Sequence, residues 1–220
     1  MNSKLRQWAV VAGLAVGQFL SSRAEASAVS APEAGWVSLF DGKTLAGWQA
    51  NENPSTFWVE DGAIVVRGDR SHLFYTGAVE AHDFKNFEFS AEVMTSPGAN
   101  SGIDFHTRWQ DKGWPKNGFE VQVNNTHKNK NRTGSLYEAQ DNPTAPVADG
   151  EWFTLFIRVE GKRARIFVNG KVISDFTEPA DWKPPVKFEG RRFSHGTFAL
   201  QGHDPESETR FRALMVRVLP

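Results

Sequence analysis

The sequence predicts an all-β protein, built as a β-sandwich or jelly roll. Short segments alternate between apolar and polar residues with period two, and turn signals separate them about every eight to twelve residues. The composition agrees, because 17 Phe and 8 Trp favour strands while 19 Gly and 11 Pro favour turns. No segment after the N-terminal stretch shows a convincing helical period, and no internal repeat is found.

The first 28 residues are interpreted as a signal peptide. Lys4 and Arg6 precede an apolar stretch, residues 8–20, that is too short to span a bilayer comfortably. Two Ala-x-Ala motifs end at Ala26 and Ala28, and cleavage is expected near one of them. We therefore expect an exported, soluble protein, periplasmic or extracellular, with no membrane attachment after cleavage.

Residues 29–34 are expected to be a linker, and residues 35–220 a single domain. The net charge of -1 gives no reason to expect a nucleic-acid partner. The absence of cysteine excludes disulfides, a thiol nucleophile and cysteine-ligated zinc.

The elements can be expected in chain order. The predicted strands are residues 35–40, 57–60, 63–66, 73–75, 84–94, 100–109, 119–125, 151–160, 164–168, 171–176, 196–203 and 211–219. Asp61-Gly62 and Asn169-Gly170 predict tight hairpin turns. Residues 133–137 could add a short strand, and the segments 126–132, 141–150 and 181–192 read as loops.

The segments 100–109 and 119–125 carry the candidate site. On the first, Asp104, His106 and Arg108 share one face, and Ile103, Phe105 and Thr107 share the other. On the second, Glu120, Gln122 and Asn124 lie opposite Phe119, Val121 and Val123. If the segments pair, the polar side chains form one patch, beside Trp109 and Trp114, whose flat surfaces suit sugar rings. The alternative is an ordinary solvated outer face.

Nine motifs follow one another in a familiar order. They are residues 39–48, 58–62, 86–88, 100–105, 118–123, 133–137, 150–152, 169–170, and 200–203 together with 211–212. In this order they resemble the 3-keto-disaccharide hydrolase domain family, a concanavalin A-like family of jelly-roll β-sandwiches. The resemblance covers essentially the whole chain after the signal peptide.

The resemblance implies cleavage of glycosides that are oxidised at C3, either as a hydrolase or as a lyase. The ketone acidifies the C2 proton, so a base can remove it and the glycosidic oxygen can leave by elimination. Such chemistry needs a base, a group that stabilises the enolate, and an acid for the leaving oxygen. As a hypothesis, the base is Glu120 or His106, the enolate is stabilised by Arg108 or by a bound divalent metal, and the candidate acids are His203 and Tyr137. The expected substrate contacts are Asp104, Gln122, Asn124, Tyr137, Gln201, Trp109 and Trp114.

No cofactor is certain, and a divalent metal stays open. Asp104, His106, Glu120 and His203 form a mixed histidine and carboxylate set of the kind that suits Zn or Mn, whereas an oxygen-only set suits Ca. Their spacing is not diagnostic, so the metal is unknown. The chemistry also makes an upstream C3 sugar oxidoreductase an expected pathway partner, although nothing in the chain encodes one.

Two other functions compete with this hypothesis. A lectin-like module could use the same patch to bind glycans without turning them over. A classical retaining glucanase is disfavoured, because Gln122 follows Glu120 and no second acid stands at the spacing that such enzymes need. A serine nucleophile is disfavoured as well, since the Gly-x-Ser-x-Gly motif is missing.

Overall fold

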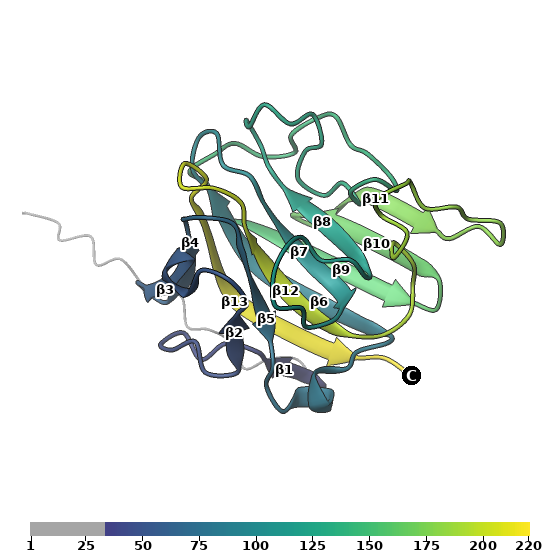
Figure 1. The fold of residues 1–220 in the computed structure, drawn as a ribbon, viewed down its shortest axis with the longest axis horizontal. Coiled ribbons are helices and arrows are strands. Elements are labelled where there is room, and N and C mark those ends of the chain that lie inside the picture. The colour runs from purple at the N-terminus through teal and green to yellow at the C-terminus, as the bar shows by residue number, and fades with distance from the viewer. Residues whose placement is uncertain (1–33) are drawn as a thin grey trace, which may run out of the picture. The chain divides into compact units, whose positions relative to one another are not determined.

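The computed structural model describes residues 34–220, so the predicted signal peptide and all but the last residue of the predicted linker lie outside the described part. Thirteen strands make up the fold (Figure 1). They are β1 (Trp36–Ser38), β2 (Trp48–Ala50), β3 (Phe57–Glu60), β4 (Ala63–Val66), β5 (Ser71–Tyr75), β6 (Phe87–Thr95), β7 (Ser101–Thr107), β8 (Phe119–Val123), β9 (Phe153–Glu160), β10 (Arg163–Val168), β11 (Lys171–Thr177), β12 (Thr197–Gly202) and β13 (Thr209–Val218).

The helical content of the described residues is limited to two short 3₁₀ turns, η1 (Pro54–Thr56) and η2 (Val79–His82). The all-β prediction is therefore confirmed. Within residues 34–220, no helix has the length and apolar character needed to cross a membrane.

The strands form two antiparallel sheets. The larger has eight strands, in the order β11-β10-β9-β6-β13-β4-β3, with β1 also paired to β13. The smaller has five, in the order β2-β5-β12-β7-β8. The two sheets pack face to face as a sandwich (Figure 1). Strands β7 and β8 are neighbours, with Asp104 opposite Glu120 and Gly102 opposite Gln122, so the two site segments pair, as a single polar patch requires.

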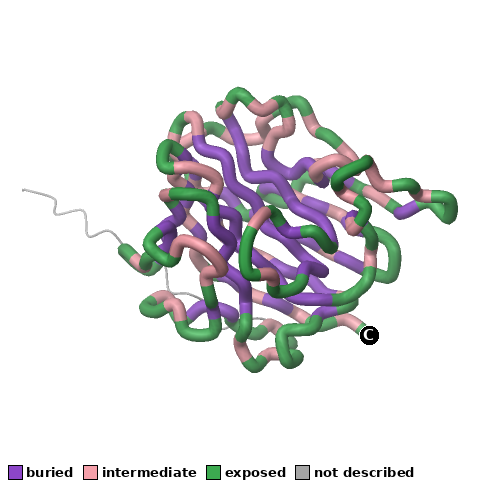
Figure 2. The backbone as a smooth tube through the Cα atoms, viewed as in Figure 1, coloured by how far each residue is buried: buried purple, intermediate pink, exposed green. Residues whose placement is uncertain are grey.

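Aromatic side chains fill the space between the sheets. Phe198 of the small sheet lies 4.7 Å from the ring of Phe84, 4.9 Å from Phe87 and 4.7 Å from Phe89. All four rings are buried, and they belong to one core cluster that draws on both sheets. The strands at the centre of the molecule are buried along their length (Figure 2).

Both predicted hairpins form. Asp61 and Gly62 have φ values of 50° and 76°, and Asn169 and Gly170 have 48° and 75°. Two consecutive residues with positive φ are the signature of a type I′ turn, whose twist matches the flanking strands.

The predicted alternation of β7 is wrong beyond Phe105. In the pairing of β7 with β12, Thr197 lies opposite Thr107 and Ala199 lies opposite Asp104, so three residue steps on β7 match two on β12. His106, inside this stretch, has a φ of 54°. This is a β-bulge, which inserts one extra residue and reverses the phase of the side chains after it. His106 therefore packs against core aromatic rings instead of joining Asp104 on the polar face.

The outer face of the small sheet is covered by loops. All five residues of β8 are buried, including those that point away from the core. Residues 133–137 run beside β8 without forming a regular strand: the Tyr137 N–H donates to the Glu120 carbonyl at 2.9 Å, and the Gln122 N–H donates to the Ser135 carbonyl at 3.0 Å. Polar side chains on this face are thus enclosed.

The core packing predicts a large cost for Phe198→Ala. Removing a fully buried ring costs about 3–5 kcal/mol of unfolding free energy, because the cavity left behind collapses only in part. Phe167→Ala is the matched control, since Phe167 is half-buried on the other side of the large sheet. Urea unfolding of both variants measures the difference, and equal losses would contradict this description of the core.

Candidate active site

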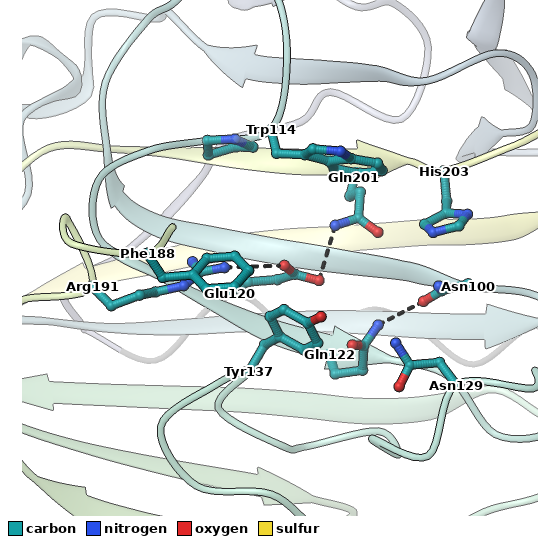
Figure 3. A pocket seen from close by; sticks show the side chains of 11 residues that line it. Asn100, Trp114, Glu120, Gln122, Asn129, Tyr137, Phe188, Arg191, Gln201 and His203 are labelled. Atoms are coloured by element: carbon teal, nitrogen blue, oxygen red, sulfur yellow. Dashed lines mark hydrogen bonds and ion pairs between the residues drawn. The ribbon is translucent and has the colours of Figure 1, made fainter. Parts of the chain in front are cut away.

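A cavity of about 140 Å³ opens on the outer face of the small sheet (Figure 3). It is lined by Asn100, Trp114, Pro115, Glu120, Gln122, Asn129, Tyr137, Phe188, Arg191, Gln201 and His203. Strands β8 and β12 supply Glu120, Gln122 and Gln201, and the remaining side chains come from loops and strand ends. The cavity thus combines one carboxylate and one guanidinium with amide and aromatic groups.

Glu120 lies at the centre of the cavity floor. Gln201 Nε2 donates a hydrogen bond to Glu120 Oε1 at 2.9 Å, and Arg191 Nη2 lies 3.5 Å from Oε2. Gly102 stands beside it on β7, where a Cβ atom would come within 2.8 Å of the Glu120 side chain. The glycine therefore gives the carboxylate its room. Burial raises the pKa of Glu120 above its usual value, while Arg191 and the Gln201 hydrogen bond act in the opposite direction.

Asp104 lies directly opposite Glu120 in the β7–β8 ladder and is completely enclosed. Neither of its carboxylate oxygens has a hydrogen-bond partner among the residues that the structure describes. Burial, followed by the negative charge of Glu120, raises the pKa of Asp104 well above its usual value, although Arg191 lowers it. Burial therefore favours the neutral form of Asp104, which lies outside the cavity lining.

Arg191 is fixed by its own loop. Gly190 accepts the N–H of Gly118 at 3.0 Å, and a Cβ atom at Gly190 would meet the Lys116 carbonyl oxygen at 1.8 Å. Trp182 Nε1 also donates to the Arg191 carbonyl at 2.9 Å. The backbone at 190–191 is therefore pressed against the start of β8, which directs Arg191 to Glu120.

The guanidinium of Arg191 keeps donors to spare. Its Cζ lies 5.2 Å from the ring centre of Phe188 and 5.8 Å from that of Tyr137, so aromatic rings hold the group in place (Figure 3). Within residues 34–220, Nε and Nη1 have no hydrogen-bond partner although both are buried. Such a group is ready to bind an oxygen that carries negative charge.

Neutral acids and amides complete the lining. Burial, with Glu138 and Glu120 nearby, raises the pKa of Tyr137, so its phenol keeps the proton. His203 Nδ1 lies 2.6 Å from Asp204 Oδ2, which orients the imidazole ring. Gln122 Nε2 donates to Asn100 Oδ1 at 2.7 Å, an arrangement that leaves the side-chain oxygen, Gln122 Oε1, free for a hydroxyl group.

Trp114 covers the cavity from above. Its indole is 43% exposed and lies 5.4 Å from His203 and 5.5 Å from His72, ring centre to ring centre. His72 is fully buried on β5, and burial lowers its pKa to about 3. The neutral ring of His72 makes the edge-on contact with Trp114, and Arg70 Cζ lies 5.6 Å from the centre of the indole, so the exposed remainder of the indole is what a ligand could contact.

The structure brings six of the expected site residues together. These are Glu120, Gln122, Tyr137, Gln201, His203 and Trp114. Asn124 lies apart from them: its side-chain N–H groups donate to the carbonyls of Asn129 and Asn131, so it shapes a loop. Arg108 and Trp109 line a different cavity.

His106 was expected on the polar face of β7, but its ring lies on the core side, against Phe87 and Phe105. Its Nε2 lies 2.9 Å from the Lys85 carbonyl, and its Nδ1 accepts the Ser194 N–H at 3.2 Å. Burial lowers its pKa to about 4, so the ring is neutral. The bulge at this residue is the physical reason for the difference.

Sequence reasoning missed Arg191, Asn129, Phe188 and Pro115. They belong to irregular segments, where no periodicity shows which way a side chain points. Asn100 belonged to a recognised motif but had no role assigned. For Arg191, the only available signal was a charged side chain in a Pro-rich loop.

The residues suggested as metal ligands do not converge. His106 lies on the core side of β7 and His203 lies at the rim of the cavity. Within the described part of the chain, no three histidine or carboxylate side chains are grouped so that they could hold a metal ion.

The family model for the 3-keto-alpha-glucoside-1,2-lyase-like domain matches residues 35–217. The match covers most of the chain, and the protein belongs to this family. The family and the fold together give it a carbohydrate-related function. A comparison with curated proteins found no match.

Solved structures share the fold. A Parabacteroides distasonis protein, provisionally named a glycosyl hydrolase, is 22% identical with a TM-score of 0.71, covering 84% of this chain and 94% of that one. The carbohydrate-binding module CBM66 from Bacillus subtilis is 14% identical with a TM-score of 0.53, covering 78% and 95%. The exoplasmic domain of VIP36, solved with Ca²⁺ and mannose, is 12% identical with a TM-score of 0.51, covering 83% and 89%. At these identities the likeness concerns the fold alone.

The buried state of Asp104 predicts an unusual effect of Asp104→Asn. A raised folded-state pKa stabilises the protein below the unfolded-state pKa, and this contribution is lost as pH rises through the folded-state value. The variant is therefore expected to gain stability relative to the parent as pH rises from 4 to 9, by about 1.4 kcal/mol for each pH unit that separates the folded-state pKa from the unfolded-state pKa.

Urea unfolding over this pH range tests the sign. Asp175→Asn is the control, because its ion pair with Arg163 lowers the pKa of Asp175, so that variant should lose stability at neutral pH. If Asp104→Asn instead lost stability relative to the parent as pH rises, the raised pKa of Asp104 would be contradicted.

Proposed function

We propose that this protein cleaves 3-keto-glycosides by removing the proton at C2 and eliminating the glycosidic oxygen. The observation that carries the proposal is the Glu120–Arg191 pair, in which a buried carboxylate and a guanidinium with unpaired donors face one cavity. The family match gives the substrate class its support.

Glu120 is the proposed base. Its raised pKa makes it a stronger proton acceptor than an ordinary carboxylate, and Arg191 keeps it ionised enough to act. Removal of the C2 proton places the electron pair in an enolate over C2, C3 and the ketone oxygen. Arg191 takes the role first given to Arg108, donating hydrogen bonds to that oxygen as negative charge develops.

The second step breaks the glycosidic bond. The enolate returns its electrons, so that the C3 ketone and a C1–C2 double bond form while the C1–oxygen bond breaks. Tyr137 or His203 gives a proton to the departing oxygen, and both line the cavity. Water added across the C1–C2 double bond then gives the free 3-keto sugar. Gln122 and Gln201 would position ring hydroxyls.

The interpretation of residues 1–28 as a signal peptide supports an exported location for this reaction. An oxidoreductase that forms a ketone at C3 would have to supply the substrate, because the elimination depends on that ketone.

A lectin-like module is the second candidate. The exposed indole of Trp114 favours it, since an aromatic platform beside hydrogen-bonding amides suits sugar binding without turnover. The similarity of fold to CBM66 and to VIP36 is compatible with this role.

Glu120→Gln separates the two functions. The variant keeps shape and hydrogen bonding but cannot accept a proton, so release of the leaving group from a 3-keto-glucoside should fall about 10²–10⁴-fold. Binding, measured by calorimetry, should stay within a few fold of the parent. Glu151→Gln is the control, because Glu151 is exposed just before β9 and does not line the cavity. Unchanged turnover in Glu120→Gln would remove Glu120 from the mechanism.

Arg191→Met should change the pH dependence as well as the rate. The positive charge of Arg191 lowers the pKa of Glu120, so its removal raises that pKa and moves the acid limb of kcat/KM to higher pH. The plateau rate should also fall about 10²–10³-fold, the usual loss when an oxyanion donor is removed.

The control for this variant is Arg192→Met, since Arg192 is a half-exposed neighbour that donates to the Trp182 carbonyl. Its pH profile should match that of the parent. A lower rate in Arg191→Met without any movement of the acid limb would show that Arg191 does not act on the base.

A further inference from the structure

A second and larger cavity, of about 660 Å³, opens on the same side of the small sheet. Gln49 of β2 and Phe74 of β5 line it from the sheet, and Thr107, Arg108 and Trp109 line it where β7 ends. It shares no lining residue with the candidate active site.

Trp109 gives this cavity a fixed aromatic surface. The indole is 42% exposed, and its Nε1 donates to Asp111 Oδ1 at 3.1 Å. Its ring centre lies 5.3 Å from that of Phe74, which is completely buried. The indole is thus held in one orientation with part of its surface free, as stacking on a sugar ring requires.

Thr107 offers an unused polar group. The residue is 1% exposed, it lines the cavity, and its hydroxyl has no hydrogen-bond partner within the described residues. The hydroxyl oxygen is itself enclosed, and a buried hydroxyl without a partner is unfavourable, so a ligand that bonds to it once the Thr107 side chain rotates towards the cavity would gain from it. The bulge at His106 turns Thr107 towards the cavity by reversing the side-chain alternation.

A hydrogen-bonded pair, Asp83 and His195, also lines the cavity, next to a segment with strained backbone angles. His195 Nδ1 lies 2.6 Å from Asp83 Oδ1, and both residues line the cavity. The preceding residues Glu80, Ala81 and His82 have φ values of 49°, 48° and 52°. Three consecutive non-glycine residues in the left-handed region are unfavourable, and such strain is concentrated at ligand-binding sites.

A single rigid loop, residues 108–116, serves both cavities. Gln110 holds it together: its Nε2 lies within 3.0 Å of the carbonyls of Lys112, Gly113 and Trp114. The Lys116 N–H donates to Gln110 Oε1 at 3.1 Å. The loop places Trp109 in the larger cavity and Trp114 in the smaller one, so one ordered segment presents an indole to each.

We propose that the larger cavity is a second saccharide subsite, in which a pyranose ring stacks on Trp109 and bonds to the Thr107 hydroxyl. The ring could belong to the substrate bound at Glu120 or to a separate glycan. The subsite rests on the carbohydrate-related function of the family, and it does not require the proposed elimination chemistry.

The test is a titration of the protein followed by ¹H–¹⁵N NMR, with methyl α-D-glucoside and α-linked gluco-oligosaccharides of two and three rings as probes. The Trp109 indole and the Thr107 amide should shift and saturate separately from the Trp114 indole. If the subsite holds a ring of the same substrate, the affinity at Trp109 should rise with chain length, whereas a separate glycan would bind there with affinity independent of length.

Two variants test whether Thr107 and Trp109 each contribute to binding at the subsite. Thr107→Val should weaken binding at Trp109 about three- to tenfold without lowering the unfolding midpoint, because its hydroxyl contributes no hydrogen bond within the described protein. Trp109→Ala should weaken binding at Thr107 tenfold or more. Trp58→Ala is the matched control, since Trp58 is 37% exposed on β3 of the other sheet.

The outcomes separate the two proposals. Shifts confined to Trp114, or shifts at Trp109 that Thr107→Val leaves unchanged, would overturn the subsite and leave the proposed reaction standing. Saturable shifts at Trp109 in a protein that does not cleave 3-keto-glycosides would support the subsite and overturn the reaction.

Discussion

The burial of Glu120 on the outer face of a sheet is the constraint on which the site depends. Outer faces of sandwiches usually meet water, where a carboxylate needs no partner. Here loops enclose that face, so the charge must be compensated, and Gln201 and Arg191 supply the compensation. The same enclosure raises the pKa of Asp104, which lies opposite Glu120 on β7. The proposed recognition and the proposed chemistry both depend on covering a polar sheet face.

The stability of the sandwich core offsets the unfavourable burial of these polar groups. Its core is anchored by aromatic contacts around Phe198 and does not depend on the outer face of the small sheet. That face can therefore carry polar groups whose burial is unfavourable. Irregular segments, residues 108–117, 133–137 and 181–195, complete the enclosure, so the rigid sheet supplies the floor and the loops supply the walls.

Periodicity predicted the parts of the site that lie on regular strands. Glu120 and Gln122 share the face of β8 that the alternation predicts, whereas Gln201 was expected only from the family resemblance. His106 was misplaced because a bulge leaves no mark in an alternating pattern, and Thr107 changed sides for the same reason. Arg191 was missed because its direction depends on backbone contacts of Gly190 with β8, which are far apart in sequence.

The central claim is that Glu120 and Arg191 act on a sugar already oxidised at C3. The direct test compares a 3-keto-glucoside with its unoxidised parent glucoside, with and without EDTA, by following release of the leaving group. The account predicts cleavage of the keto compound alone, with the EDTA arm showing whether a metal takes part. Cleavage of both glycosides would contradict it and indicate an ordinary glycosidase. Binding without cleavage of either would indicate a lectin-like module.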